Sequence, residues 1–250
     1  MRVAALYDIH ANLPALEAVL QEIEQIGVDR IFIGGDVVPG PMPCETIERL
    51  SELNLPCEFI QGNGEIAVLE EMAGKAATGV PEQYRPALQW TAQQLGPEHQ
   101  HLLSHWRPTL RMQHPNSGEI LFCHATPRNA TEIFTRNTPE ARLLSTAFTN
   151  VDASIVVCGH THMQFERFAG STRVVNAGSV GMAYEDVAGA FWALLGSDLE
   201  AGPDVELRLT HYDVESALKE IERAGFPDEW PQASRDEATA FFERIARDRA

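Results

Sequence analysis

Short apolar runs alternate with amphipathic stretches along the first quarter of the chain. The runs at 2–7, 30–34 and 57–62 have the length of buried strands. Between the first two, 12–27 shows the apolar spacing of a helix, with Asn12 as its N-cap and Gly27 at its end. A second helix is predicted over 44–53. The alternation of strands and helices predicts a layered α/β fold that contains parallel strands.

The pattern changes after the third predicted strand. Helix-like stretches, broken by glycine and proline, cover 65–107, and we predict that they form a helical cap inserted into the domain. Two runs at 109–114 and 119–124 then predict a hairpin around the turn at 115–118.

The second half of the chain is richer in strands. A helix is predicted over 139–148 and a buried strand over 153–160. Four closely spaced strands follow and suggest an antiparallel sheet, and two amphipathic helices end the chain: 164–169, 172–178, 189–196 and 204–212, then 214–224 and 235–249. We therefore expect a single domain, 1–250, in which two sheets pack face to face with helices outside.

Charge and hydropathy exclude several classes of protein. The longest apolar runs are far shorter than the roughly 20 residues of a membrane span, and Asp8 and His10 interrupt any N-terminal signal sequence. Nineteen Lys and Arg against 36 Asp and Glu give a net charge of -17, which argues against general binding of nucleic acids. We expect a cytoplasmic protein that has no membrane contact.

The cysteines carry little functional information. Cys44, Cys57, Cys123 and Cys158 form no CxxC pair, so neither a zinc knuckle nor a disulfide framework is indicated. We expect reduced and mostly buried thiols, with Cys123 turned into the core because neighbouring residues of a strand face opposite sides.

Polar side chains that bind metals follow five of the apolar strands. In α/β sheets, ligands bind beyond the carboxyl ends of the strands, so we predict that these side chains share one rim. His160 and His162, two residues apart in "CGHTH", would point to the same side of an extended segment. The seven candidates are Asp8, His10, Asp36, Asn63, His124, His160 and His162.

Seven oxygen and nitrogen donors exceed what one tetrahedral zinc ion needs. They suit two metal ions if one carboxylate bridges them. Carboxylate and amide oxygens, with no cysteine among the donors, favour manganese or iron over structural zinc.

These motifs, in this order and spacing, resemble the calcineurin-like metallophosphoesterases, and most of all their small bacterial and archaeal phosphodiesterases. The resemblance covers roughly residues 1–180 and implies a four-layer αββα sandwich. It also implies that Asp36 bridges two ions. One ion would be held by Asp8, His10, Asp36 and His162, and the other by Asp36, Asn63, His124 and His160.

The implied reaction is hydrolysis of a phosphodiester, or of a nucleotide-like phosphate in a small substrate, by a hydroxide that bridges two transition-metal ions. Manganese is preferred, and iron, zinc or nickel remain alternatives. A phosphomonoesterase, including a protein serine/threonine phosphatase, is a second interpretation. A non-catalytic protein-binding scaffold of the same fold, such as the retromer subunit, is a third, but the chain retains all seven ligands.

The chain departs from the family pattern at Gly64. Many relatives have a histidine here that is thought to protonate the leaving group, and loss of a general acid typically costs about 10²- to 10⁴-fold in rate. Three explanations are open: the substrate has an acidic leaving group, another residue supplies the proton, or the activity is weak. The remaining histidines in or beside the predicted cap are His99, His101, His105 and His114.

Three further residues lie near these motifs along the chain. Arg128, four residues after His124, is the best placed cation for a substrate phosphate, since guanidinium groups match phosphate in bidentate fashion; an exposed loop arginine is the alternative. Asn176 and Gly178, in "VVNAGSVG", are expected in a loop near the metals.

Overall fold

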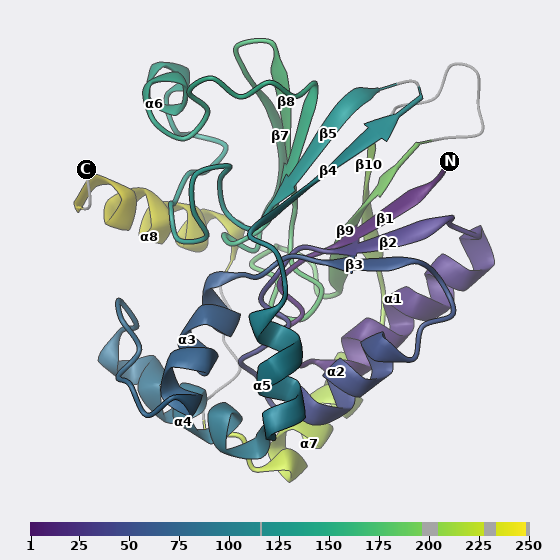
Figure 1. Cartoon of the computed structure of the whole chain (residues 1–250), viewed down its shortest axis with the longest axis vertical. Helices are drawn as coiled ribbons and strands as arrows, with labels where there is room; N and C mark the ends of the chain where they lie inside the picture. Colours follow the sequence, from purple (N-terminus) through teal and green to yellow (C-terminus); the bar gives the residue numbers. More distant parts are fainter. Residues whose placement is uncertain (116, 197–204, 228–233, 249–250) are drawn as a thin grey trace.

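Two five-stranded sheets, packed face to face, form the centre of the molecule, and helices cover their outer faces (Figure 1). The computed structural model describes residues 1–115, 117–196, 205–227 and 234–248. This arrangement confirms the predicted αββα sandwich. None of the described helices is long and apolar enough to cross a membrane.

The first sheet has the strand order β10-β9-β1-β2-β3. Strands β1, β2 and β3 are parallel, whereas β9 is antiparallel to β1 and to β10. Their bounds are β1 (Val3–Leu6), β2 (Arg30–Ile33), β3 (Cys57–Phe59), β9 (Ala190–Leu195) and β10 (Val205–Thr210).

The second sheet has the order β4-β5-β6-β8-β7. Strands β5, β6 and β8 are parallel, and the two edge strands are antiparallel to their neighbours. Their bounds are β4 (Thr109–His114), β5 (Gly118–Cys123), β6 (Ile155–Cys158), β7 (Gln164–Ala169) and β8 (Thr172–Ala177).

The helices fall into groups by the layer that they cover. Helices α1 (Leu13–Ile26), α2 (Pro43–Ser51) and α7 (Val214–Ala224) lie along the outer face of the first sheet, and α6 (Glu140–Ser145) packs near β7 (Figure 1). Between β3 and β4 the chain forms α3 (Asn63–Met72), a 3₁₀ turn (Glu82–Tyr84), α4 (Arg85–Gln94) and α5 (Pro97–Ser104). The last helix is α8 (Arg235–Asp248).

Strands β1, β6 and β9 are apolar and buried along their whole length, because both of their faces are covered. In β1, Ala4 and Leu6 belong to the apolar cluster under the helices, whereas Val3 and Ala5 belong to the cluster between the sheets. A third cluster fills the outer face of the second sheet. Three apolar interfaces therefore hold four layers together.

The interface between the sheets is pinned by two contacts close to the strand ends. Phe32 of β2 stacks on Phe122 of β5, with ring centroids 4.0 Å apart and 3° between the planes. The buried Tyr7 hydroxyl donates a hydrogen bond of 2.8 Å to the Val157 carbonyl on β6. Both contacts fix the ends of β1, β2, β5 and β6 relative to one another.

One topological expectation is wrong. The four late strands do not form an antiparallel sheet of their own: β7 and β8 complete the second sheet, whereas β9 and β10 complete the first. The pairs β7–β8 and β9–β10 are antiparallel as expected. The other neighbour of β8 is β6, which is parallel to it, and the other neighbour of β9 is β1, which is antiparallel to it. Asn116 of the predicted turn, Asp204 and Arg249 lie outside the described residues.

We expect Phe122→Ala to lower the free energy of unfolding by about 3–5 kcal/mol, the usual loss for a large buried aromatic side chain. Phe122 is fully buried between the sheets. Phe168→Ala is the matched control, because Phe168 is 57% exposed on β7. Urea denaturation followed by circular dichroism measures both changes, and an equal effect of the two substitutions would contradict this account of the core.

Candidate metal centre

The structure brings all seven candidate ligands to one place, where β1, β2, β3, β5 and β6 end. On one side, His10 Nε2 lies 3.2 Å from His162 Nε2, and His162 Nε2 lies 3.4 Å from Asp8 Oδ1. His10 Nε2 is also 3.8 Å from Asp36 Oδ2. Asp8, His10 and His162 form a cluster whose ligand atoms all lie within 4.8 Å of one another.

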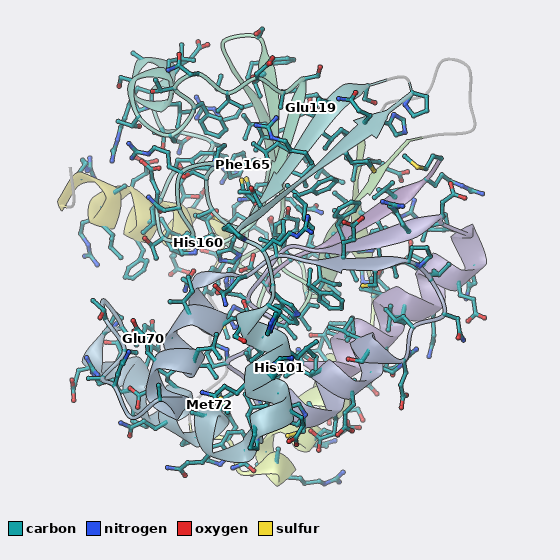
Figure 2. All side chains as sticks on the ribbon, viewed as in Figure 1. Glu70, Met72, His101, Glu119, His160 and Phe165 are labelled. Carbon is teal, nitrogen blue, oxygen red and sulfur yellow. The ribbon has the colours of Figure 1, made fainter. Side chains whose placement is uncertain are left out.

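The second half of the centre is built around His124. Its Nε2 atom lies 3.5 Å from Asp36 Oδ1 and 3.9 Å from Asp8 Oδ1. One terminal atom of the Asn63 carboxamide is 3.0 Å from His124 Nε2 and 2.8 Å from His160 Nδ1. Figure 2 shows His160 near the middle of the molecule, below the second sheet. The two carboxylates, Asp8 and Asp36, thus lie between two groups of histidines.

The candidate ligands lie on sharply turned backbone. Asp8, His10, Asp36, His160 and His162 have φ angles between 47° and 70°, a left-handed conformation that is uncommon for residues other than glycine. Each such residue costs on the order of 1–2 kcal/mol. Because strain of this kind persists only where the surroundings impose it, its concentration at the strand ends marks a functional site.

Backbone carbonyls orient three of the imidazoles. The Nδ1 atom of His10 lies 3.0 Å from Pro39 O, that of His124 2.9 Å from Gly34 O, and that of His162 2.7 Å from Met182 O. A carbonyl can only accept, so each Nδ1 carries the proton and each Nε2 presents a lone pair to the centre. This is the arrangement that metal-binding histidines adopt in proteins.

The Asp8 carboxylate has one supported and one unsupported oxygen. Its Oδ2 atom accepts a 2.8 Å hydrogen bond from the His160 backbone N–H, across Gly159, where any Cβ would overlap Oδ2. Its buried Oδ1 atom accepts no hydrogen bond from the residues that the structure describes. A buried carboxylate oxygen without a donor is costly, and here it faces the lone pairs of His162 and His124. A cation fits this position.

The pKa values of the buried ligands also favour a bound cation. Burial and the nearby charge of Asp8 raise the pKa of Asp36 well above its usual range. Burial and the neighbouring His162 lower the pKa of His10 to about 3. For Asp8, burial would raise the pKa, but the attraction of His162 and other histidines lowers it below the ordinary value. Two adjacent buried carboxylates cannot both ionise without compensation, and a metal ion supplies that compensation.

Sequence reasoning missed Glu65, which is fully buried behind Asp36. Its carboxylate accepts backbone hydrogen bonds from Asp36 (2.9 Å), Val37 (2.7 Å), Val38 (3.1 Å) and Gly62 (2.7 Å). Burial and the charge of Asp36 raise its pKa to about 7. The residue holds the loop after β2 against the start of α3, and so joins Asp36 to Asn63. An acidic residue one place after "GNG" was the only signal.

The structure explains the missing histidine at position 64. The Gly64 N–H donates a 2.6 Å hydrogen bond to Asp36 Oδ1. A Cβ at Gly64 would overlap the Val38 carbonyl oxygen and would lie 2.8 Å from Pro39 Cδ. The loop that follows Asp36 occupies the space of a side chain, so this backbone admits only glycine.

The other histidines proposed as proton donors do not reach the centre. His99, His101 and His105 lie on α5 or at its end, where His99 accepts from the Gly96 N–H and His101 contacts His105. His114 ends β4 and lies 3.1 Å from Met1 O. None of the four is among the described residues that line the cavity at the metal centre.

Arg128 lies on an exposed loop. Its guanidinium pairs with Glu132, and its side chain is 53% exposed. It is not among the described residues that line the cavity at the centre. Contact between Arg128 and a substrate phosphate therefore stays a prediction.

Asn176 and Asn12 both act on backbone near the centre. The Asn176 amide donates to Gly159 O at 2.8 Å and to Thr161 Oγ1 at 3.1 Å, which fixes the loop between His160 and His162. Asn12 caps α1, as predicted, by accepting from the Ala15 N–H. The four cysteines are unpaired thiols, and Cys123 is buried in the core as expected.

Comparison with known proteins agrees with the geometry. The family model of the calcineurin-like phosphoesterase superfamily domain matches residues 1–195. The chain therefore belongs to the calcineurin-like phosphoesterase superfamily, a family that implies phosphoester hydrolysis and divalent metal ions. This membership confirms the resemblance that the strand-end motifs indicated.

Three relatives match nearly the whole chain. An uncharacterised protein of Methanocaldococcus jannaschii is 27% identical over 245 residues, which cover 91% of this chain and 94% of that protein. The crystal structure of a metallophosphoesterase from Sphaerobacter thermophilus is 25% identical, with a TM-score of 0.69, and the match covers 91% of this chain and 95% of that one. A hypothetical protein of Pyrococcus horikoshii shares the fold, with a TM-score of 0.75 at 20% identity and coverage of 96% and 97%.

We expect Glu65→Gln to lower the free energy of unfolding by about 2 kcal/mol or more, because an amide NH₂ would face backbone N–H donors. Metal affinity should fall about 10- to 100-fold, as is typical when the support of metal ligands is lost. Chemical denaturation and calorimetric titration with Mn²⁺ measure the two effects. The control is Glu52→Gln at an exposed position; unchanged Mn²⁺ affinity in Glu65→Gln would refute the positioning role.

Restoring the family histidine by Gly64→His should not raise turnover. Overpacking against Val38 should instead cost about 1–3 kcal/mol of stability. Ala73→His, at the exposed end of the same helix, is the control for adding an imidazole to α3. Thermal denaturation measures the change in stability, and phosphoester hydrolysis measures turnover. A faster Gly64→His enzyme would contradict this account, because the loop after Asp36 would then have to move aside for the histidine.

Proposed function

We propose that the chain is a dinuclear metal-dependent hydrolase that cleaves a phosphodiester or a nucleotide-like phosphate in a small substrate. The observation that carries this proposal is the pair of histidine groups that face each other across Asp8 and Asp36. A single ion would use only part of this donor set. Manganese is the preferred metal, with iron, zinc or nickel as alternatives, because the donors are imidazole, carboxylate and amide groups. We place the activity in the cytoplasm.

The residues divide into two ligand sets that share Asp36. Asp8, His10, Asp36 and His162 would hold one ion; Asp36, Asn63, His124 and His160 would hold the other. When bound, two such ions supply a water of lowered pKa and neutralise charge on the phosphoryl oxygens. The short distances between Asp8 and His162 and between Asp36 and His124 support this division.

The chain's own residues contribute orientation and exclusion of water. Asp8, Asp36 and His124 are at most 3% exposed, so these ligands are almost completely shielded from solvent. The Gly64 N–H takes one Asp36 oxygen, and backbone carbonyls of Gly34, Pro39 and Met182 keep the Nδ1 protons on the histidines. These three histidines therefore present their Nε2 lone pairs before any ion binds, which lowers the cost of reorganisation.

Gly64 has no side chain that could protonate a leaving group. We therefore propose a preference for substrates whose leaving group is a weak base and departs without protonation. An aryl phosphodiester meets this requirement. The monoesterase alternative is retained as an outcome of the test below, since the ligand set alone serves both reactions.

The test compares bis(p-nitrophenyl) phosphate with p-nitrophenyl phosphate on protein reconstituted with Mn²⁺. We expect a higher kcat/KM for the diester, and a loss of about 10³-fold or more in Asp36→Asn and His162→Ala, since metal ions contribute several kcal/mol to such reactions. Metal content by mass spectrometry should fall in both variants. His101→Ala, an exposed histidine on α5, is the control. Full turnover in His162→Ala would sink the assignment, and a higher kcat/KM for the monoester would replace the diester by the alternative.

A further inference from the structure

The candidate metal centre opens into a cavity of about 330 Å³. This volume is at the lower end of the range for sites that bind small molecules. His10, Asp36, Asn63, His160 and His162 line one end of the cavity. The metal centre therefore faces a space large enough for part of a substrate.

The far end of the cavity is apolar. Three separate segments form it: the chain from the end of α3 into α4, the loop between β5 and α6 that carries Ile133, and the C-terminal helix α8 (Figure 1). We call this end the apolar chamber, and its walls are Val80, Pro81, Leu88, Ile133, Phe242 and Ile245.

Aromatic rings connect the chamber to a candidate ligand. Tyr184 stacks on His162, with ring centroids 5.1 Å apart and planes 14° apart. Phe242 of α8 packs against Tyr184 at 6.2 Å, and Phe241 packs against Phe242 at 5.4 Å. A continuous aromatic surface thus runs from the metal centre to α8.

The cavity lacks the side chains that bind several phosphates. No Lys or Arg is found among the described residues that line it, and its only acidic residue is Asp36. The one arginine expected near the site, Arg128, pairs with Glu132. Chains of phosphate groups need several cations to neutralise them, and the described residues that line the cavity offer positive charge only through the metal ions that they would hold. The metal centre can therefore neutralise one phosphate group of the substrate, and the described lining residues offer no cation for a second.

We propose that the substrate carries a single phosphate esterified to an apolar group, aryl or alkyl, that occupies the apolar chamber. This inference rests on the proposed phosphoesterase activity and narrows its substrate class. It disfavours dinucleotides and nucleoside polyphosphates, because nothing in the described walls would pair with their additional phosphates. The apolar group is recognised by burial of its surface, and the phosphate by the metal centre.

The test uses phosphonates, which are not hydrolysed. Mn²⁺-loaded protein is titrated by calorimetry with methylphosphonate, propylphosphonate and phenylphosphonate. Burial strengthens binding about fourfold per methylene group, so we expect propylphosphonate to bind about 15-fold more tightly than methylphosphonate. Phenylphosphonate should bind at least as tightly as the propyl compound. Equal affinities for methyl- and propylphosphonate would overturn the proposal.

Variants locate the effect in the chamber. Phe242→Ser combined with Ile245→Ser should reduce the preference for propylphosphonate to below about threefold, since the α8 wall would lose its apolar surface. Phe168→Ser, an exposed phenylalanine on β7, is the matched control and should keep the full preference. If the α8 variant fails to fold by circular dichroism, Tyr84→Ser tests the opposite wall, because Tyr84 lines the cavity and is 42% exposed.

The same titrations separate this inference from the proposed function. Protein that binds propylphosphonate preferentially but turns over neither p-nitrophenyl ester would support the chamber and overturn the phosphoesterase activity. Protein that turns over the esters but binds all three phosphonates equally would overturn the chamber and leave the activity. A preference that survives in both wall variants would also overturn the chamber.

Discussion

The rest of the structure depends on one constraint: two carboxylates, and beside them two imidazoles, lie close together in a buried space. Asp8 and Asp36 lie beside one another, and the Nε2 atoms of His10 and His162 are 3.2 Å apart although both Nδ1 atoms face carbonyls. Such an arrangement is unfavourable by itself, because buried charge needs a partner. The apolar interfaces of the four layers, with Phe32 stacked on Phe122, hold the strand ends together against this cost. The fold therefore keeps in place a set of donors that only cations can satisfy.

Much of the centre could be predicted from the sequence, because each ligand follows an apolar run and strands of known direction bring their ends to one rim. Partners within the sheets could not be predicted in the same way. Strands β8 and β9 are neighbours along the chain but belong to different sheets. A local apolar pattern predicts that a segment is a strand, but it does not predict which strand pairs with it. The expectation of one late antiparallel sheet failed for this reason.

Other features depend on packing that no local pattern records. An acidic residue in the first turn of a helix is usually solvated, and Glu65 is buried only because the loop after β2 wraps its amides around the carboxylate. The sequence showed that a histidine is absent at Gly64 but not that the Val38 carbonyl fills its place. Helix α8 was predicted as amphipathic, yet its apolar face serves the cavity at the centre as well as the core. Its place in the wall follows from the tertiary fold alone.

The partners of the histidine Nδ1 atoms are carbonyls of the main chain, at Gly34, Pro39 and Met182, and not side chains. A carbonyl is supplied by every residue type, so the support of His162 survives replacement of Met182 as long as the backbone path is kept, whereas any Cβ at Gly34 would overlap the Tyr7 ring. Evolution is free to redesign the surroundings of such a site, and with them the molecules it admits, while its chemistry stays unchanged.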